Sequence, residues 1–512
     1  CPASDRLGVR RAGALCAAIV GLITASAFPQ LADGFGDLST RLGESAPTGQ
    51  DVGLGLVEAG GTDADRYAPD LAAFPNRNIL LMSGPSITSA HATQVLNTFV
   101  ARAPGVVDVW SWEALDWLQG GFLNFGAGAP LSPPTGLRVF NHSWVAGNND
   151  PAVDNDLMRR FDYQITRDGS IECVGTSNSL NATTPYILSS QFNGLTVGHP
   201  AGAHQDTIGG GRDGQGRMKP DLVASAGNSS NSAPRAAALA SLLLETAATD
   251  PSVSANPDAD DPQVIKAAIL AGATHPDGWS NEPIVKGAVR GVTTRPLDFE
   301  WGAGYLNADR SHLILTGGEQ AASTSVPAEP TVDEVGWSRT TIASGTSRYW
   351  RFETFQETDE VVILATWPRV VAANFASWSM MNIDLRLHRV EGTTLLPLSG
   401  DDGLPYFDSG TVVSESDVDN VELLVVRGLE PGEYVFEIFR NVGATSTSVA
   451  VAWIMPETTP PAPIGDLNGD GIIDGADLGL LLIDWGRPGP GDLNGDGIVN
   501  GVDLGLLLQN WG

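Results

Sequence analysis

The residues best placed for chemistry lie at the start of an apolar helix, in the stretch from Gly216 to Thr246. Residues 236–244 are small or apolar at almost every position, which predicts a buried helix. Pro234 suits the first turn of this helix, because proline has no N–H group to leave without a partner there. Ser230 stands just ahead, where unpaired N–H groups and the positive end of the helix dipole converge. A developing oxyanion would be stabilised at this place, so Ser230 is a candidate nucleophile.

Several motifs carry a resemblance to a known enzyme family. The sequence GRMKPDLVAS…SSNSAPRAAALASLLLE resembles the nucleophile segment of subtilisin-like serine peptidases (subtilases), in which GR-x-KPDLVAPG and G-T-S-x-A-x-P precede a buried, Ala-rich helix. DVGLGLVEAGG (51–61) resembles the family's first strand, and SAHATQV (89–95) resembles its histidine segment. IECVGTSN (171–178) and LDFEWGAGYLNADRS (297–311) resemble two further segments, so the motifs occur in the family's order.

The resemblance implies a Glu/His/Ser triad. It assigns Glu58 as the acid, His91 as the general base and Ser230 as the nucleophile. Asn178 and the Ser230 N–H group would then form the oxyanion hole. A serine hydroxyl needs a histidine to take its proton, and the histidine needs an anion to hold its tautomer. The implied reaction is hydrolysis of protein or peptide substrates through an acyl-enzyme, as in a secreted serine endopeptidase.

Departures from the family pattern leave alternatives open for these roles. Glu58 stands where the family has aspartate, and its extra methylene would push the carboxylate past the imidazole unless the backbone compensates. Asp63 or Asp65 could substitute for it. Ser229, one residue early, is the rival nucleophile.

The specificity pocket also departs from the pattern. FNHSWVAGN (140–148) resembles the substrate strand of the family, and Val145 stands where glycine normally lines the pocket. This predicts a narrower or reshaped pocket. The alternative function is therefore a catalytically degenerate subtilase-fold protein that acts as a secreted binding or surface-assembly module.

Charge and the first residues indicate an exported protein. The chain has 60 acidic and 29 basic side chains and a net charge of −31, which argues against nucleic acid and anionic membranes as partners. Arg6, Arg10 and Arg11 precede an apolar run over 12–23, and small residues at 25–27 would allow cleavage near Ala27. This pattern predicts a secretory signal peptide rather than a membrane span. We therefore expect periplasmic passage and a secreted or cell-surface location, with no transmembrane anchor.

The 512 residues are too many for one core, so we expect a multidomain chain. The predicted fold is an α/β subtilisin-like parallel sheet, then an all-β sandwich, then a small α calcium-loop domain that resembles a dockerin. The predicted ranges are a signal peptide (1–27), a short lead (28–50), the peptidase domain (51–317), a linker (318–335), the β-sandwich (336–455), a Pro-rich linker (456–464) and the tandem calcium-loop domain (465–512).

Hydrophobic patterning supports the first two folds. In the peptidase domain short β-rich runs alternate with helical stretches, which predicts a parallel sheet with helices on both faces. The next domain has period-two runs without helical periodicity, which predicts a sandwich. SRYWRFET, NIDLRL, DNVELL and GLEPGEYVFEI resemble the pre-peptidase C-terminal type of sandwich, which implies packing or substrate contact. The expected elements are strands at 52–57, 137–141, 171–175, 195–198, 349–352, 361–367, 383–387, 421–426, 434–439 and 449–453, and a helix at 263–273.

The C-terminal residues form an internal repeat, GDLNGDGIIDGADLGLLLIDWG (465–486) and GDLNGDGIVNGVDLGLLLQNWG (491–512). Each copy places oxygen ligands at the spacing of a calcium loop, with a glycine at the tight turn. Hard oxygen ligands suit Ca²⁺ better than a soft metal, so two Ca²⁺ ions are expected. The predicted ligands are Asp466, Asn468, Asp470, the Ile472 carbonyl, Asp474 and Asp477, and then Asp492, Asn494, Asp496, the Ile498 carbonyl, Asn500 and Asp503.

One helix follows each predicted loop, so the pair resembles a type I dockerin. The resemblance implies a cohesin-like partner for the tail. Gly475-Ala476 and Gly501-Val502 stand where the family's recognition positions normally hold hydroxyl residues. A merely structural tail therefore stays open as the alternative.

Other reactive residue types have structural interpretations. Cys173 lies on an apolar strand and is predicted to be a small buried hydrophobe. It is the one cysteine left after removal of the signal peptide, so no intramolecular disulfide is expected. The remaining histidines lack metal-ligand spacing such as HExxH, so no metal or other cofactor is expected in catalysis.

Overall fold

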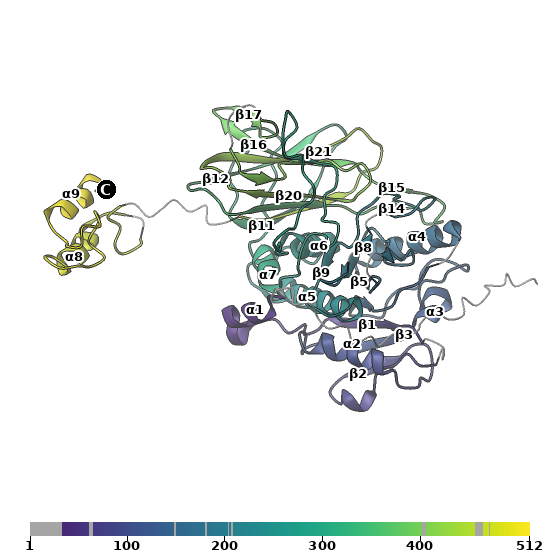
Figure 1. Ribbon diagram of the computed structural model, residues 1–512. Helices are drawn as coiled ribbons and strands as arrows, with labels where there is room; N and C mark the ends of the chain where they lie inside the picture. The colour runs from purple at the N-terminus through teal and green to yellow at the C-terminus, as the bar shows by residue number, and fades with distance from the viewer. Residues whose placement is uncertain are drawn as a thin grey trace, which may run out of the picture.

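A parallel sheet lies at the centre of the predicted peptidase domain (Figure 1). The computed structural model describes residues 33–60, 65–147, 150–179, 182–202, 204–205, 208–401, 406–455, 464–470 and 472–511. The predicted signal peptide (1–27) and Asp63 lie outside the described residues. The strand order is β2-β3-β1-β4-β5-β7-β9 and every neighbouring pair is parallel. The strands are β1 (Gly53–Glu58), β2 (Asn78–Leu81), β3 (Asp108–Glu113), β4 (Leu137–His142), β5 (Ile171–Gly175), β7 (Leu195–Gly198) and β9 (Leu222–Val223).

Helices cover both faces of this sheet. α2 (Ala90–Val100) and α5 (Ser229–Thr249) pack on the face that carries Leu56, and α4 (Pro151–Asp168) packs on the face that carries Trp112. The predicted parallel α/β architecture is therefore confirmed. The shorter elements here are α1 (Phe35–Leu42), η1 (Gly43–Ser45), η2 (Leu71–Ala73), α3 (Ala114–Asp116), η3 (Trp117–Gly121), β6 (Ala182–Thr183) and β8 (His204–Gln205).

Two further sheets form the sandwich, as the period-two runs predicted. One has the order β10-β19-β16-β21-β12 with β17 beside β16, and the other has the order β11-β22-β13-β20-β18. Their facing apolar side chains, among them Trp350, Phe436 and Trp453, form a core between the sheets. The strands are β10 (Val292–Thr293), β11 (Val335–Thr341), β12 (Ser347–Thr354), β13 (Val361–Thr366), β16 (Ile383–Glu391), β17 (Thr394–Pro397), β18 (Ser409–Gly410), β19 (Val413–Ser414), β20 (Val421–Arg427), β21 (Gly432–Arg440) and β22 (Ser448–Ile454). A separate hairpin consists of β14 (Val370–Val371) and β15 (Trp378–Ser379).

The parallel-sheet domain and the sandwich share one apolar core. α6 (Pro262–Ala271) and α7 (Ala308–Thr316) lie between α5 and the sheet that contains β11, β13 and β22 (Figure 1). Ile265 of α6 and Leu364 of β13 belong to the same buried cluster, and both are inaccessible to water. The two domains therefore cannot separate without exposing apolar surface.

The segment 318–335, expected to be a linker, is hydrogen-bonded along the sandwich. The Gln320 N–H group donates to the Trp337 carbonyl oxygen at 2.8 Å. Ser323 and Tyr349 exchange two backbone hydrogen bonds, at 2.8 and 3.0 Å. Strand β10, inside the range expected for the peptidase domain, pairs with β19 of the sandwich. Backbone pairing therefore crosses the predicted boundary in both directions.

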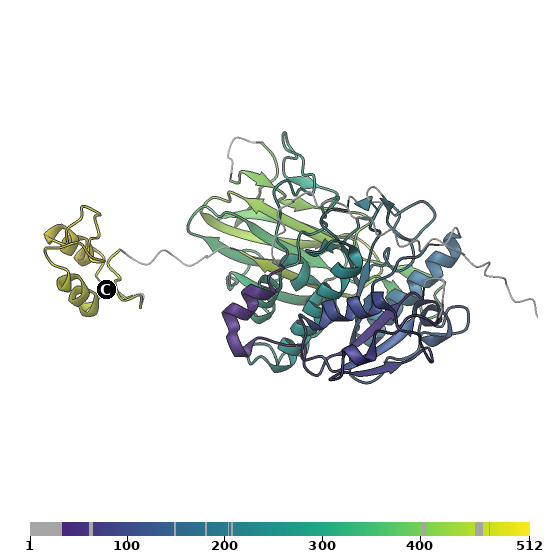
Figure 2. The ribbon, with the colours of Figure 1, turned by 60° about the horizontal axis from the view of Figure 1, so that its bottom comes forward.

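The first described residues are held against the parallel-sheet domain. α1 lies beside α7 (Figures 1 and 2), and the Asp33 carbonyl oxygen accepts the Ala308 N–H group at 3.0 Å. The Asp33 carboxylate pairs with Arg102 at 3.3 Å and also with Arg235. This one carboxylate therefore joins the end of α2 to α5.

The tail contains two short helices, α8 (Gly475–Ile483) and α9 (Gly501–Gln509). Each begins with a capping box, in which Asp474 or Asn500 caps the helix and the aspartate three residues later bonds back. Leu481 and Leu507 pack with two loop residues in a small core of their own. A loop therefore precedes each helix, in two matching units.

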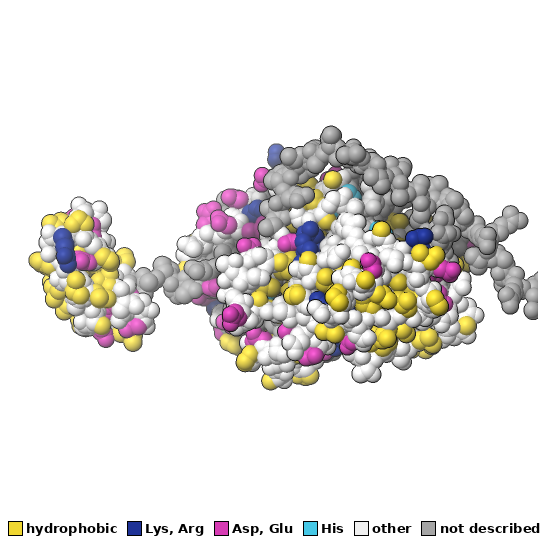
Figure 3. All heavy atoms as spheres, turned by 90° about the horizontal axis from the view of Figure 1, so that it is seen from below, with side chains coloured by type: hydrophobic (Ala, Val, Ile, Leu, Met, Phe, Trp, Pro, Cys, Tyr) yellow, Lys and Arg dark blue, Asp and Glu magenta, His cyan; other side chains and the backbone are white. Residues whose placement is uncertain are grey.

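The surface reflects the acidic composition. The face in Figure 3 carries scattered acidic side chains, few basic ones and many hydrophobic ones. Among the helices of the described ranges, none is both long and apolar enough to cross a bilayer.

A buried histidine adds a polar link between the two domains. His275 Nδ1 lies 2.9 Å from Glu360 Oε1, and Arg427 contacts the other carboxylate oxygen at 2.9 Å. Burial would raise the pKa of Glu360, but the hydrogen bond and charge of His275 and the charge of Arg427 outweigh it and lower this pKa to about 2. The ionised carboxylate therefore stabilises the folded state.

We predict that Glu360→Gln lowers the free energy of unfolding near neutral pH by about 3 kcal/mol, the equivalent of a pKa depressed from 4.5 to about 2. This stabilisation is fully present above the unfolded pKa of about 4.5 and is lost as the pH falls through about 2. Urea unfolding at about pH 7 and about pH 3.5 should therefore show the difference shrinking. Glu282→Gln, which removes an exposed partner of Arg295, is the matched control. A difference independent of pH would contradict the prediction.

Candidate active site

Glu58 and His91, far apart in the sequence, meet at the end of β1. Glu58 is the last residue of β1, and its side chain is 1% exposed. His91 is the second residue of α2, whose N-cap Ser89 accepts the Ala92 N–H group at 3.1 Å. His91 Nδ1 lies 2.7 Å from Glu58 Oε2, a hydrogen-bonding distance. The longer side chain of glutamate therefore reaches the imidazole.

Burial and the hydrogen bond between Glu58 and His91 shift the pKa of each residue in opposite directions. Burial raises the pKa of Glu58, although the hydrogen bond from His91 opposes the shift. The hydrogen bond to Glu58 raises the pKa of His91 above its ordinary value, and burial opposes this shift. The His91 side chain is still 48% exposed. Because Glu58 holds Nδ1, the other ring nitrogen is left to exchange protons.

Ser230 is the second residue of α5. The side chain of the N-cap residue Asn228 accepts the Asn231 N–H group at 2.9 Å, and the helix begins at Ser229. The Ser230 hydroxyl donates to the Ser143 carbonyl oxygen at 3.2 Å, and the Ser143 hydroxyl donates to the Ser230 carbonyl oxygen at 2.9 Å. Ser143, the residue after β4, therefore holds Ser230 through a reciprocal pair of hydrogen bonds.

Direct contacts join the helices that carry His91 and Ser230. The Asn231 side-chain oxygen accepts the Thr98 hydroxyl at 3.2 Å and the Gln94 amide at 3.4 Å. Both candidate residues stand at the second position of their helix, so they lie at corresponding ends of two packed helices. In the described residues, the hydroxyl of Ser230 is bonded to Ser143 and not to His91. The structure therefore joins two of the predicted triad members directly and the third through helix packing.

Asn178 lies at the N-terminus of α5. Its side-chain oxygen accepts the Ser229 N–H group at 2.8 Å, which leaves the amide NH₂ as its available donor. The Ser229 hydroxyl is buried and contacts the Thr176 carbonyl oxygen at 2.5 Å. Ser229 is therefore held inside the protein, whereas Ser230 is only partly buried. This burial disfavours Ser229 as the rival nucleophile.

Sequence reasoning missed the roles of Ser143 and Asn231. Ser143 belongs to the segment that resembles the substrate strand, but no local pattern predicts that it would bind Ser230. Asn231 follows the serine directly, and only helix packing places it against α2. Val145, expected to reshape the specificity pocket, is 44% exposed. Asp65, an alternative acid, is exposed, and the acid beside His91 is Glu58.

A second His–Glu pair lies inside the sheet. His142 Nε2 is 2.8 Å from Glu172 Oε2, and both side chains are fully buried. Burial lowers the pKa of His142 to about 3 and raises the pKa of Glu172 well above its ordinary value. Burial therefore favours the uncharged form of both side chains. Cys173 is a free, fully buried thiol whose pKa is raised by burial, as expected for a structural cysteine.

The predicted calcium ligands contact their own loops. Asp477 accepts the N–H groups of Leu467, Asn468 and Asp474 at 2.8, 3.1 and 2.9 Å, and Asp503 makes the equivalent contacts in the second loop. In the tail residues that the structure describes, no three acidic side chains converge on one point. The ligand atoms predicted for the metal are nevertheless all oxygen atoms, which are the ligands that Ca²⁺ takes.

No protein-family model matches the chain, and a search of curated proteins finds no match. Among solved structures the chain is similar to a lanthipeptide protease (13% identity, TM-score 0.32, 52% of this chain and 88% of that chain). It is also similar to a protease from Pseudoalteromonas arctica (13% identity, TM-score 0.29, 54% and 94%). A third is fervidolysin from Fervidobacterium pennivorans, a keratinolytic enzyme related to subtilisin (13% identity, TM-score 0.32, 83% and 62%). These three neighbours are proteases.

We predict that Glu58→Gln and Glu58→Asp both lower the pKa of His91, because the first removes the charge and the second draws the carboxylate back by one methylene. The His91 imidazole signals followed by NMR during a pH titration give this pKa directly. The NMR signals of His388, which contacts Glu437 at 2.8 Å in the sandwich, serve as the internal control. A His91 pKa that stays the same in both variants would show that the hydrogen bond does not form in solution.

Proposed function

We propose that this protein is a secreted serine endopeptidase that hydrolyses peptide bonds through Glu58, His91 and Ser230. The observation that carries the proposal is the 2.7 Å contact between the buried Glu58 and His91, on a helix packed against the one that presents Ser230. A histidine whose basicity is raised by a carboxylate and a partly buried serine, each at the start of one of two packed helices, are the parts needed for nucleophilic catalysis. Protein and peptide substrates follow from this chemistry.

The proposed reaction begins when the Ser230 hydroxyl leaves Ser143 and turns toward His91. The Ser230 oxygen forms a bond to the scissile carbonyl carbon while His91 takes the hydroxyl proton. Glu58 holds the imidazole and stabilises its positive charge. The carbonyl oxygen gains negative charge, which the Ser230 N–H group and the Asn178 amide would stabilise. His91 then gives the proton to the leaving amine, the C–N bond breaks, and water hydrolyses the acyl-enzyme with the same proton transfers.

One contact favours a second candidate function, that of a non-catalytic binding module. The Ser230 hydroxyl is hydrogen-bonded to a backbone carbonyl oxygen, and this bond must break before the reaction. If that cost were not recovered on substrate binding, the domain would bind peptides without cleaving them. Turnover separates the two functions.

We predict that Ser230→Ala abolishes casein hydrolysis and labelling by a serine-directed phosphonate, while the variant keeps its fold. Loss of a triad nucleophile costs roughly 10⁶-fold in turnover. Ser229→Ala is the matched control and should keep labelling at position 230, because Ser229 contacts Thr176 and Asn178 inside the protein. Mass spectrometry of the labelled peptide locates the adduct. An adduct elsewhere, or an unlabelled folded protein, would reject the peptidase proposal.

We propose further that the tail binds two Ca²⁺ ions and docks to a cohesin-like partner. When bound, the ion would neutralise the loop carboxylates; its ligands would come from Asp466, Asn468, Asp470, Ile472, Asp474 and Asp477, and from Asp492, Asn494, Asp496, Ile498, Asn500 and Asp503. Large apolar side chains that are at least 39% exposed support a docking role, among them Leu480, Leu482, Ile483, Trp485, Val502, Leu508 and Trp511. Export is proposed from the signal-peptide pattern.

We predict that Ca²⁺ binds the first loop more tightly, because that loop has aspartate at the position where the second has Asn500. Affinity rises with the number of charged ligands. Calorimetric titration of the full chain should give two binding events, and Asp474→Asn should make them equal, whereas Asn500→Asp should strengthen the weaker one. Circular dichroism of residues 464–512 should lose helix signal when a chelator is added. A signal insensitive to the chelator would contradict the calcium proposal.

A further inference from the structure

Residues 187–193, named here the bridging segment, connect the two backbone segments that flank the serines of α5. At one end the Ile187 N–H group donates to the Ala146 carbonyl oxygen at 3.2 Å. The Ser189 hydroxyl donates to the Gly175 carbonyl oxygen at 2.8 Å. The bridging segment therefore holds the chain after β4 and the end of β5 at a fixed separation.

Both flanking segments adjoin the candidate nucleophile. Ala146 stands three residues after Ser143, whose carbonyl oxygen accepts the Ser230 hydroxyl. Gly175 faces α5 so closely that a methyl group there would lie 3.4 Å from the Ser229 hydroxyl oxygen. A displacement of the bridging segment would therefore change the spacing of the backbone on either side of Ser230.

The other end of the bridging segment is bound to α4. The fully buried Asp162 carboxylate accepts the Phe192 N–H group at 3.0 Å and the Asn193 N–H group at 2.8 Å. The Asn193 amide donates to the Asp162 carbonyl oxygen at 3.1 Å and to the Thr166 hydroxyl at 3.0 Å. A single helix residue thus fixes two consecutive peptide groups.

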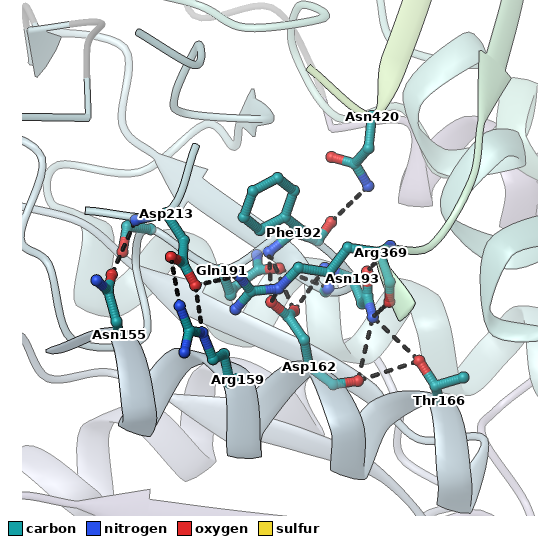
Figure 4. A network of polar contacts seen from close by, with 12 residues as sticks. Asn155, Arg159, Asp162, Thr166, Gln191, Phe192, Asn193, Asp213, Arg369 and Asn420 are labelled. Atoms are coloured by element: carbon teal, nitrogen blue, oxygen red, sulfur yellow. Dashed lines mark hydrogen bonds and ion pairs between the residues drawn. The ribbon is translucent and has the colours of Figure 1, made fainter. Parts of the chain in front are cut away.

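Two residues of the sandwich, Arg369 and Asn420, contact Asp162 or the bridging segment, as Figure 4 shows. Arg369 Nε lies 2.6 Å from Asp162 Oδ2, and both side chains are fully buried. The Arg369 N–H group donates to the Asn193 side-chain oxygen at 2.9 Å, and the Asn193 amide returns a bond to the Arg369 carbonyl oxygen at 3.1 Å. The Asn420 amide donates to the Phe192 carbonyl oxygen at 2.9 Å. The bridging segment is therefore held from two domains at once.

The buried ion pair between Arg369 and Asp162 restricts movement of the bridging segment. Arg369 also contacts Asp213 at 3.1 Å and lies over the Phe192 ring at 4.4 Å from its centre. A buried ion pair tolerates little displacement, because either charge without its partner would lose both solvation and Coulomb attraction. Removal of the guanidinium would leave Asp162 charged and partly unpaired, and its two hydrogen bonds to the bridging segment would change with it.

We propose that Arg369 is a positioning residue, through which the sandwich sets the backbone spacing beside Ser230 and so the fit of peptide substrates. The inference rests on the proposed peptidase function. Arg369 touches neither Ser230 nor His91; it acts through Asp162 and the bridging segment. A peptide substrate must fit between the flanking segments, whereas a small phosphorylating reagent needs only Ser230 and its base.

The test compares these two reactions in Arg369→Met, which removes the charge and keeps much of the length. The substrates are peptides that differ in the side chain before the scissile bond. For each peptide, kcat/KM of the variant should be about 10²-fold lower than that of the unchanged protein, mainly through a higher KM, because a displacement of about 1 Å has this effect on positioning. The rate of labelling of Ser230 by diisopropyl fluorophosphate should stay within about twofold, since the triad is untouched. Arg369→Lys should recover part of the loss, because it restores the charge without the planar fork.

The chain offers a matched control in Arg339→Met. Arg339 of β11 also pairs across the two domains, with Asp258 at 3.0 Å and Asp261 at 2.9 Å, but these partners precede α6 and do not contact the bridging segment. This variant should keep both reaction rates. If Arg369→Met does not fold, Asn420→Ala, which removes the hydrogen bonds of Asn420 to the carbonyl oxygens of Phe192 and Trp367 but no charge, should show the same separation of rates at smaller amplitude.

Two outcomes would overturn the positioning role: parallel loss of peptide hydrolysis and labelling in Arg369→Met, or no loss of either. If the unchanged protein neither cleaves peptides nor reacts with the reagent, the peptidase proposal fails instead. Hydrogen exchange then decides the positioning role. Faster exchange at the Ile187, Phe192 and Asn193 N–H groups in Arg369→Met, but not in Arg339→Met, would support it, and equal exchange would reject it.

Discussion

The burial of α5 is the constraint on which the structure depends. Its alanines and leucines from Ala233 to Ala247 are almost inaccessible to water, because the sheet, α2, α6 and α7 surround this part of the helix. A helix packed on every side can neither slide nor turn without opening cavities, and cavities are costly in a close-packed interior. The N-terminus of α5, with Ser230, is therefore fixed relative to the sheet.

The polar residues around Ser230 follow from the direction of the strands. Glu58 ends β1, Ser143 follows β4, and Asn178 follows β5 after a short loop. Because the strands are parallel, their carboxyl ends meet at one edge, where side chains from distant parts of the chain gather. The first turns of α2 and α5 are bonded to this edge, because His91 contacts Glu58 and Ser230 contacts Ser143. This arrangement accounts for the proposed chemistry better than any single motif does.

The sandwich is joined to the parallel-sheet domain by two kinds of contact. α6 packs on β13 and β22, and α7 packs on β11 and β22, so that association of the domains buries apolar surface. The buried ion pairs contribute less, because the cost of removing charges from water offsets their attraction. They do restrict the docking to one geometry, since any other would leave charges such as Arg369 and Asp162 without partners. This distinction explains how a domain without catalytic residues can still position the segments beside the site.

The sequence by itself determined the types and order of the elements, because hydrophobic periodicity depends only on local chain geometry. The parallel sheet, the buried helix over 236–244 and the main sandwich strands were all predicted from such patterns. The helix begins earlier than expected, at Ser229, so Ser230 and Pro234 both lie inside it. The boundaries at 317 and 335 rested on composition, and composition does not record that residues 318–335 pair with β11 and β12. The reach of Glu58 to His91 was also open, since it depends on where the backbone of β1 ends relative to α2.

Only the tertiary structure decided which polar side chains meet. It placed Glu58 against His91, Ser143 against Ser230, and Arg369 of the sandwich against Asp162 of α4. None of these contacts can be recognised from hydrophobic periodicity in the sequence. Each joins two residues far apart in the chain and requires one particular distance and orientation. The physical reason is that apolar burial is additive along the sequence, whereas a hydrogen bond or buried ion pair exists only when both partners arrive at the same point.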